Sequence, residues 1–366
     1  MVDIFSALKN GQGAVSIFNV SKNVSRNQLA AQLQTDFQNK VQNAETQVQD
    51  RLNAKMAIVD RKGKAFSDLT KNLREALDVL QNSRKRVESI ERRLDSMMLD
   101  VNRAQKSFDD PDTDFQAEGY ARAFDSGFRS IDLAISETRV SPNLLNNSTY
   151  PMEYPTNSNG GYSSFFGVDL SANYSLEEAG GEVWKLESSG SSIRRYDADG
   201  NETNVVASFV SGLTLNSIDA SDNVSFSVGS DASSSTTYNA TIKRAGIGIM
   251  HAWAYDDLAT DSGRARALED LSSAKSIAQL EVTRYEVVET SLKFYLEKAK
   301  NEIDGINQEK VNLQRELMTE LYDKRQKLQQ QFQATQSNLA QAFLVRSNYA
   351  SLIPSGSMGD FFNLLT

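Results

Sequence analysis

Residues 66–108, which read FSDLTKNLREALDVLQNSRKRVESIERRLDSMMLDVNRAQKSF, decide the fold of this 366-residue chain. An apolar residue recurs there at every seventh position: Phe66, Leu73, Leu80, Val87, Leu94, Val101 and Phe108. A second series with the same spacing comprises Leu271, Ala278, Tyr285, Leu292, Ala299, Ile306 and Leu313. Apolar side chains at this spacing form one stripe along a helix that packs against another helix in a coiled coil. The two stretches therefore predict a pair of long helices.

Towards both ends of the chain the apolar spacing widens. Between Leu29 and Val59 the apolar residues step mostly by four, and after Leu313 they recur every eleven residues. A period below about 3.6 residues per turn gives a left-handed supercoil, and a longer period drifts the other way. Because the two series change period in mirrored order, we expect the first and last helices to run side by side. The residues predicted to pair there are Leu29, Leu33 and Phe37 with Phe332, Leu339 and Phe343.

The composition changes at Ser141 and Pro142 and stays rich in Ser, Asn, Thr and Gly to about residue 243. Residues 182–188 and 224–228 alternate apolar with polar side chains, which is the period of a β-strand. An Asp-Gly pair, Asp199 and Gly200, predicts a hairpin turn between residues 195–196 and 205–206. We therefore expect residues 150–245 to form a small antiparallel β domain, inserted between the two halves of a helical rod.

The fold class expected from these patterns is mainly α with an inserted β domain (α+β). Helices are predicted over 25–108, over about 114–139 after a capping box that pairs Thr113 with Gln116, and over about 262–349. The expected domains are an N-terminal arm 1–24, the N-terminal rod half 25–140, the inserted β domain 141–250, the C-terminal rod half 251–353 and an apolar tail 354–366. In that tail Phe361 and Phe362 have no local partner, so we expect them to dock between subunits.

The overall charge argues against several classes of partner. The formal net charge is -9 and the pI is about 5.0, whereas nucleic-acid binding needs a clustered positive surface. The basic clusters at 84–86 and 92–93 are predicted to be solvated helix flanks. The chain contains no cysteine, its first residues do not resemble a cleaved secretory signal, and no stretch approaches the length of a membrane span. An extracellular location would therefore require export without a cleaved signal peptide.

The sequence offers no catalytic, cofactor-binding or metal-binding set. Its one histidine, His251, lies in an apolar stretch and is expected to pack or to hydrogen-bond rather than to catalyse. Asp197, Asp199 and Asn201 imitate the start of an EF-hand, but Glu202 stands where that loop needs glycine, so a turn is expected. Glycosylation motifs such as those at Asn147 and Asn223 are uninformative without a known host. We predict no enzyme and no cofactor.

The ends of the predicted rod carry few charges. Residues 28–49 contain seven Gln and three charged residues, and residues 326–341 contain seven Gln and one charged residue. A helix pair surrounded by water usually carries Glu and Lys on its flanks, while amide flanks suit helices packed by other helices, where a charge would need a partner. This pattern predicts assembly into a polymer. The alternative is ordinary compositional bias in a long coiled coil.

The C-terminal segment resembles a known family. Leu328-Gln-Gln-Gln-Phe332-Gln-Ala-Thr-Gln-Ser-Asn-Leu339, followed by Ser347-Asn-Tyr349, resembles the closing helix of the flagellar filament cap, and Asn363-Leu-Leu is similar to the end of flagellins. A rod made from both chain ends with an inserted β domain also resembles the plan of bacterial flagellar axial proteins. The N-terminus lacks the opening motifs of flagellin and of the cap, which leaves open the member that it resembles.

The resemblance implies a non-enzymatic structural subunit of an extracellular bacterial filament, flagellin-like or cap-like, that polymerises through its terminal helices. Its partners would be copies of itself in a polymer or ring, other flagellar axial proteins and an export chaperone, with no nucleic acid. Two alternatives stay open. One is a cytosolic coiled-coil scaffold or adaptor, and the other is a secreted tip or adhesin-like module that binds through the β domain.

Overall fold

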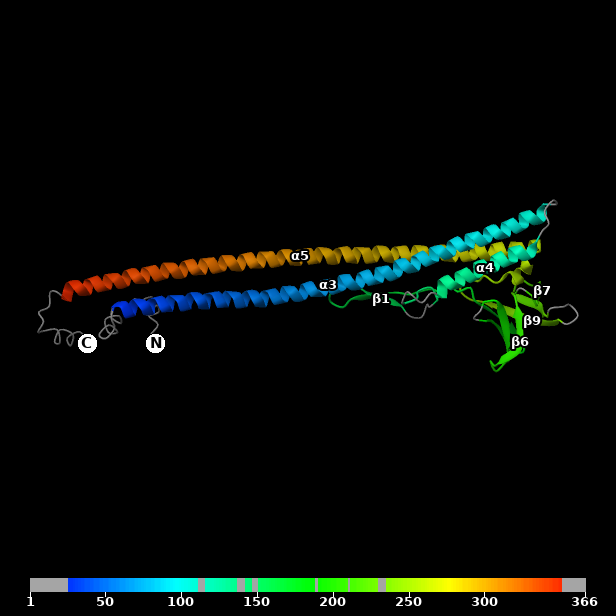
Figure 1. The fold of residues 1–366 in the computed structure, drawn as a ribbon, viewed down its shortest axis with the longest axis horizontal. Helices are drawn as coiled ribbons and strands as arrows, with labels where there is room; N and C mark the ends of the chain where they lie inside the picture. Colours follow the sequence, from blue (N-terminus) through cyan, green and yellow to red (C-terminus); the bar gives the residue numbers. More distant parts are fainter. Residues whose placement is uncertain are drawn as a thin grey trace. The chain divides into compact units, whose positions relative to one another are not determined.

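The structure, a computed structural model, describes residues 26–110, 116–136, 142–146, 151–187, 190–209, 211–229 and 235–350. The helices are α3 (Arg26–Asp109), α4 (Ala117–Ser136), the 3₁₀ segment η1 (Ala252–Leu258) and α5 (Asp261–Ala350). The strands are β1 (Met152–Pro155), β2 (Tyr162–Phe165), β3 (Tyr174–Glu178), β4 (Val183–Leu186), β5 (Ser192–Tyr196), β6 (Glu202–Ser208), β7 (Leu213–Ile218), β8 (Asn223–Val228) and β9 (Thr236–Arg244). The predicted fold class is confirmed, because two long helices enclose an antiparallel β region in the sequence (Figure 1).

The predicted long helices agree with α3 and α5 to within one residue at each end, and α4 lies within the predicted range 114–139. The arm 1–24, the cap at Thr113, the motif at Asn147 and the tail 354–366 lie outside the described residues. The predicted domain bounds stay predictions. The chain divides into two compact units, which we call the β-bearing unit (Ala65–Asn301) and the terminal unit (Met1–Lys64 with Glu302–Thr366).

In the β-bearing unit the seven-residue stripes of α3 and α5 form the core of an antiparallel helix pair. Five successive stripe positions of α3, from Leu73 to Val101, are buried, as are those of α5 from Leu271 to Ala299. Asp95 pairs with Lys275 at 2.6 Å and Glu91 accepts a hydrogen bond from Gln279 at 2.8 Å. These two contacts lie four residues apart on each helix and in opposite directions, so α3 and α5 keep one antiparallel register here.

The last member of the α3 stripe departs from the prediction. Phe108 is 48% exposed, because it lies in the final turn of α3, where the stripe runs out. The guanidinium of Arg264 lies 4.4 Å from the centre of its ring. Phe108 therefore makes a cation–π contact at the end of the helix pair rather than a core contact.

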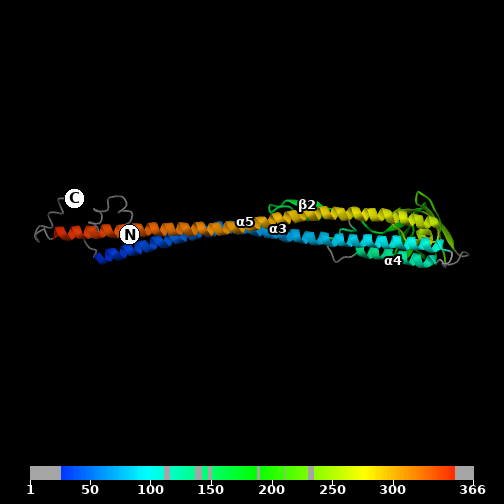
Figure 2. The ribbon, with the colours of Figure 1, turned by 90° about the horizontal axis from the view of Figure 1, so that it is seen from above.

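Helix α4 lies alongside α3 in the β-bearing unit (Figure 2) and buries an aromatic and aliphatic face. The side chains buried on this face include Phe124, Phe128, Ile131 and Ile135. Gly127 permits a close approach to α3, because a Cβ atom there would lie 2.5 Å from Cγ of Met97.

The predicted solvated cluster at 84–86 is wrong for Arg86, which is buried. Its Nε donates to the carbonyl oxygen of Ala134 and its Nη2 to that of Ile135, both at 2.9 Å. The last carbonyls of a helix have no partner within the helix, and a cation complements the negative end of its dipole. Arg86 thus caps the C-terminal end of α4, a role that no spacing within α3 could indicate.

The β region contains one seven-stranded antiparallel sheet, in the order β6-β5-β4-β3-β9-β8-β7, and a separate hairpin of β1 and β2. The predicted hairpin turn at Asp199 and Gly200 is confirmed between β5 and β6, where Asp197 accepts a hydrogen bond from the backbone N–H of Asn201 at 2.7 Å. One face of the sheet buries Trp184, whose ring makes edge contacts with Phe226 and Tyr238. The sheet and the helices of this unit share one core.

His251 lies in this core, as predicted for a packing residue, between the rings of Phe128 and Phe209, with centroid distances of 3.9 and 4.0 Å. Its Nδ1 lies 3.1 Å from the hydroxyl of Tyr174, which accepts a hydrogen bond from Trp253 at 2.9 Å. Burial lowers the pKa of His251 to about 3, so the ring is neutral at physiological pH.

Asp125 of α4 is a carboxylate held in the same region at a cost in stability. Its Oδ1 accepts a hydrogen bond from the backbone N–H of Ala252 at 2.8 Å. Burial raises the pKa of Asp125 to about 6, and the nearby carboxylate of Asp257 also raises it. Because the folded pKa lies above the unfolded one, the ionised side chain destabilises the fold above about pH 6.

We expect Asp125→Asn to raise the free energy of unfolding by about 1–2 kcal/mol at pH 8, because Asn keeps the acceptor without the charge. The gain should vanish at about pH 3.5, where the Asp125 carboxyl is protonated in both the folded and the unfolded chain. Urea unfolding, followed by tryptophan fluorescence at both pH values, measures the free energy of unfolding. Asp132→Asn, at an exposed position of the same helix, is the matched control. An equal gain at both pH values would contradict this account.

Candidate assembly surface of the terminal helix pair

The terminal unit contains the outermost described part of the two long helices, where α3 and α5 pair through a small apolar cluster. Leu29, Leu33 and Leu339 are buried, and Phe332 and Phe343 pack against them. The ring of Phe37 stacks on that of Phe332 with a centroid distance of 4.5 Å and an interplanar angle of 30°. Offset stacking of this kind adds specificity to the burial of apolar surface.

A second cluster lies further along the same helix pair. Val48, Leu313 and Leu317 are buried there, with Leu52, Met56 and Leu321 packed against them. Ion pairs flank this cluster: Arg51 with Glu320 at 2.9 Å, Lys310 with Asp60 at 2.5 Å, and Arg325 with Glu45. The antiparallel order of these pairs fixes the register of the two helices in this unit.

The structure brings together six of the eight residues predicted for the assembly interface, and Phe361 and Phe362 lie outside the described residues. The six contact one another within one chain. Leu33 is 2% exposed, so its side chain is covered by the chain's own helices and not left for a neighbouring copy. Any effect of this cluster on assembly would come from holding the two helices together. Its role between copies stays a prediction.

The surface around this closed core is made of amides. All seven Gln side chains of residues 28–49 and all seven of residues 326–341 are exposed. The charged side chains of the first stretch, Asp36, Lys40 and Glu45, are half-buried, and Lys327 is the one charge in the second. The exposed positions of these two stretches thus present amides, hydroxyls and alanines, apart from Lys327.

Exposed apolar side chains also lie on α5, before its amide-rich stretch 326–341 begins. Met318 and Tyr322, one helical turn apart, are 65% and 67% exposed. The sequence pattern does not indicate them, because the apolar stripe of α5 runs through Leu317 and Leu321, each one residue earlier. No apolar series spaced by eleven includes Tyr322, because the position eleven residues later is Gln333.

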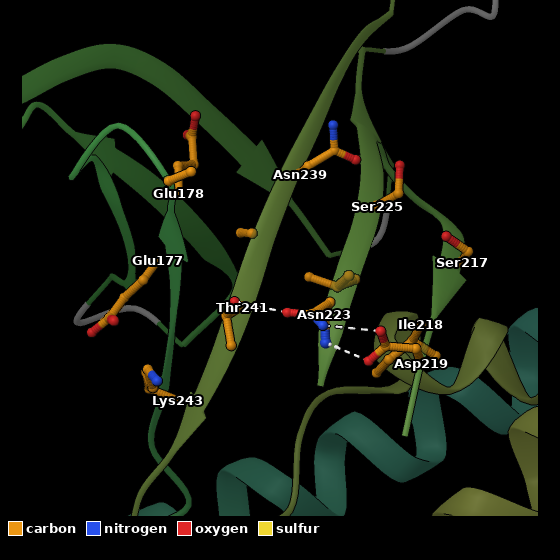
Figure 3. A pocket seen from close by; sticks show the side chains of 13 residues that line it. Glu177, Glu178, Ser217, Ile218, Asp219, Asn223, Ser225, Asn239, Thr241 and Lys243 are labelled. Carbon is orange, nitrogen blue, oxygen red and sulfur yellow. Dashed lines mark hydrogen bonds between the residues drawn. The ribbon is translucent and has the colours of Figure 1, made fainter. Parts of the chain in front are cut away.

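A shallow groove of about 570 Å³ lies on the β sheet, over β3, β9, β8 and β7 (Figure 3). The side chains of Asn239, Ser225 and Ser217 follow one another across paired strands there. Asn223 is held in place, because its Nδ2 donates to Asp219 at 2.9 Å and its Oδ1 accepts from Thr241 at 3.0 Å. The hydrogen bonds from Asn223 also lower the pKa of Asp219. Glu177 and Lys243 also line the groove, which is therefore polar and carries charges of both signs.

Within the described residues, no group of three or more His, Asp and Glu side chains is arranged to hold a metal ion. The helices of the described part contain no apolar segment long enough to cross a lipid bilayer.

No protein-family model matches the chain, and no curated protein sequence matches it significantly. Among solved structures, FlgL of Xanthomonas campestris is 10% identical, with a TM-score of 0.30, and the match covers 73% of this chain and 99% of FlgL. FliC from Burkholderia pseudomallei is 14% identical, with a TM-score of 0.28, and the match covers 62% of this chain and 98% of FliC. TM-scores this low do not establish a common fold. The family of the chain therefore stays open.

Proposed function

We propose that this chain is a non-enzymatic structural subunit of an extracellular bacterial filament assembly of the flagellar type. It polymerises through its paired terminal helices, while the inserted β domain faces solvent. Its partners are other copies of itself, together with other flagellar axial proteins and an export chaperone. The flagellar assignment rests on the C-terminal segment 328–349 and on the plan of two chain ends that enclose a β domain.

The observation that carries the proposal is the combination of a closed apolar core with an uncharged polar surface in the terminal unit. The core of Leu29, Leu33 and Leu339 is already covered by the chain itself. Other helices that packed on the exposed glutamines around this core would bury few unpaired charges, because glutamine is neutral. Each amide can also both donate and accept a hydrogen bond. Charged flanks, as found on the ion-paired section near Arg51 and Glu320, would need matched partners.

One observation favours a second candidate function. The polar groove over β3, β9, β8 and β7 would suit a secreted module that binds a glycan or a surface protein through its β domain. A binding module of this kind predicts ligand capture by the full chain without polymers. A cytosolic scaffold predicts a discrete dimer.

Assembly is tested by negative-stain electron microscopy of the full chain beside a variant that lacks residues 1–50 and 325–366. We expect filaments or closed oligomers from the full chain alone, because the variant has lost the amide surface. If both proteins remain as separate particles, the proposal of a polymer is wrong and the alternative of a coiled-coil scaffold remains.

Two milder double variants distinguish an effect of the amide surface on assembly from a loss of folding. Gln38→Glu with Gln330→Glu places two charges on the amide surface without touching the core, and should prevent assembly. Asn82→Asp with Asn102→Asp places two charges at exposed positions of the β-bearing unit and should leave assembly unchanged.

A further inference from the structure

In the β-bearing unit, helix α5 carries a second apolar series on the side that faces away from its own core. Leu280, Val287 and Phe294 recur at seven-residue intervals and are 61%, 62% and 64% exposed. Successive residues of a helix are about 100° apart, so Val287 lies about 200° around α5 from the buried Tyr285. Apolar residues at seven-residue intervals on an exposed face are typical of a helix that pairs with another helix.

Small hydroxyl residues stand between these three apolar residues. They are Ser276, Thr283 and Thr290, so the six residues follow one another at alternating steps of four and three, and we call this set the α5 seam. Each hydroxyl donates to the carbonyl oxygen four residues earlier, at 3.0, 3.1 and 2.9 Å respectively. A hydroxyl bonded to its own helix keeps that hydrogen bond when water is removed. The α5 seam can therefore be buried without leaving these hydroxyls unsatisfied.

The charged side chains of this stretch lie off the seam. Five charged residues occur between residues 276 and 294, and none belongs to the six seam positions. All five pair within the chain, in the ion pairs Arg284–Glu281 at 2.7 Å, Arg84–Glu286 at 3.2 Å and Lys293–Glu289 at 3.3 Å. A charge on a partner helix would lose water against this seam without gaining a counter-charge. The α5 seam therefore favours an uncharged partner surface.

The alternation of large and small residues makes the α5 seam its own complement. If two copies of α5 run antiparallel, the layers between them are Leu280 with Thr290, Val287 with Thr283, and Phe294 with Ser276. Each layer then combines one large and one small side chain, so the space between the helices is filled evenly. Parallel pairing would instead place Phe294 on Phe294 and Ser276 on Ser276, which separates the helices in one layer and leaves a gap in another.

We propose that the α5 seam of one copy pairs with the α5 seam of a second copy in an antiparallel dimer with two-fold symmetry. The occupant is a second copy because the reversed seam supplies both properties that the surface selects, the absence of charge and a small residue opposite each large one. A two-fold contact uses the same surface on both copies and closes at the dimer. It does not use the terminal helices, so it goes beyond the proposed function and does not depend on it.

The size of the seam sets the strength of this dimer. Residues 276–294 span about 27 Å, and nearly half the circumference of a helix 10–12 Å across gives roughly 450 Å² per copy. Two copies would bury about 900 Å², whereas stable complexes bury about 1,200–2,000 Å² and transient ones less. Near the two-fold axis Arg284 approaches its counterpart, as does Glu286, and the intrachain partner of each offsets the like charges. The contact is therefore a weak, reversible dimer that high salt does not weaken.

The test uses full-length single-cysteine variants, because the chain contains no cysteine of its own. Thr283→Cys and Val287→Cys are mixed in equal amounts under mild oxidation, and non-reducing gels measure the disulfide-linked dimer. The antiparallel pair brings these positions into one layer, and a disulfide needs Cα atoms within about 7 Å. The mixture should form the covalent dimer at least about tenfold faster than either variant alone. A mixture of Asn82→Cys and Asn102→Cys, both at exposed positions of α3, measures random collision.

A second set of variants tests whether the apolar residues hold the contact. Adding Leu280→Asp and Phe294→Asp to both cysteine variants should slow cross-linking at least about tenfold, because each carboxylate would be buried without a partner. Both positions are exposed, so circular dichroism should show unchanged helix content. Polymers formed through the terminal helices should remain, since this contact is separate from them. Cross-linking that is equally fast with these carboxylates present would contradict the contact.

The outcomes separate this contact from the proposed function. If Val287→Cys alone cross-links as fast as the mixture, the antiparallel dimer is wrong. Cross-linking no faster than random collision overturns the dimer and leaves the seam to a different protein or to the ends of the chain itself, while polymers seen by electron microscopy would keep the proposed function. The expected cross-linking without polymers would support the dimer and overturn the proposed function.

Discussion

Replacing both Phe332 and Phe343 with Asp should separate the terminal helices and abolish assembly, while the β-bearing unit stays folded. Both rings pack against the cluster of Leu29, Leu33 and Leu339. A carboxylate placed there without a partner costs several kcal/mol, which exceeds what a cluster of this size contributes. Electron microscopy should show the loss of polymers, and circular dichroism should show a partial loss of helix.

The matched control places the same charges where the structure has no core. Leu280→Asp with Phe294→Asp adds two carboxylates to α5 at positions more than half exposed. This control should keep its helix content and should still assemble. Polymers formed by the Phe332 and Phe343 variant would show that pairing of the terminal helices is not required for assembly.

The second large effect is the acid response of His251. Its folded pKa of about 3 lies below the ordinary value of 6.5, so the unfolded chain takes up this proton first. The stability that neutral His251 contributes is therefore complete above pH 6.5 and is lost as the pH falls towards 3. Between pH 7 and pH 4 the free energy of unfolding should fall by about 3 kcal/mol through this residue alone.

Asp125 and Asp257 titrate in the opposite sense, because burial raises the pKa of each to about 6. The dependence of the stability of the unmodified protein on pH therefore contains both effects. Comparison with the variant His251→Gln isolates the contribution of His251. At pH 7 the variant should be less stable, since it loses the stacking on Phe128 and Phe209. The difference in the free energy of unfolding between the unmodified protein and the variant should be smaller by about 3 kcal/mol at pH 4 than at pH 7. Urea unfolding at the two pH values measures it. A difference that does not change with pH would contradict a buried neutral histidine.

The long helices and the β insertion could be predicted from the sequence because each follows from a period. Seven-residue spacing placed Leu80 and Val87 in the core of α3, and alternation placed Phe226 of β8 on the buried face of the sheet. The mirrored change of period predicted that Leu33 and Leu339 share one cluster. Period is sufficient in these cases because a helix or strand that buries one face must repeat its apolar residues at the geometry of that element.

The features that escaped prediction depend on contacts between distant segments. Arg86 reads as one more solvated cation, and its burial is decided by the end of α4, about fifty residues later in the chain. The pairing of β3 with β9 joins strands separated by five others, and no local pattern indicates it. The exposed Tyr322 escapes prediction for another reason, because no apolar series includes it and the position eleven residues later is Gln333.

The matched register of α3 and α5 limits how this chain can change in length during evolution. In each unit contacts such as Asp95 with Lys275 and Asp60 with Lys310 follow one antiparallel register, so an insertion in one helix alone would move all later apolar residues out of alignment with their partners. Insertions or deletions would be tolerated in pairs, one in each helix at facing positions. They would come in multiples of seven where Leu80 and Tyr285 lie, and of eleven where Leu328 and Leu339 lie. The β insertion is free of this restriction, and homologues should vary most in length there.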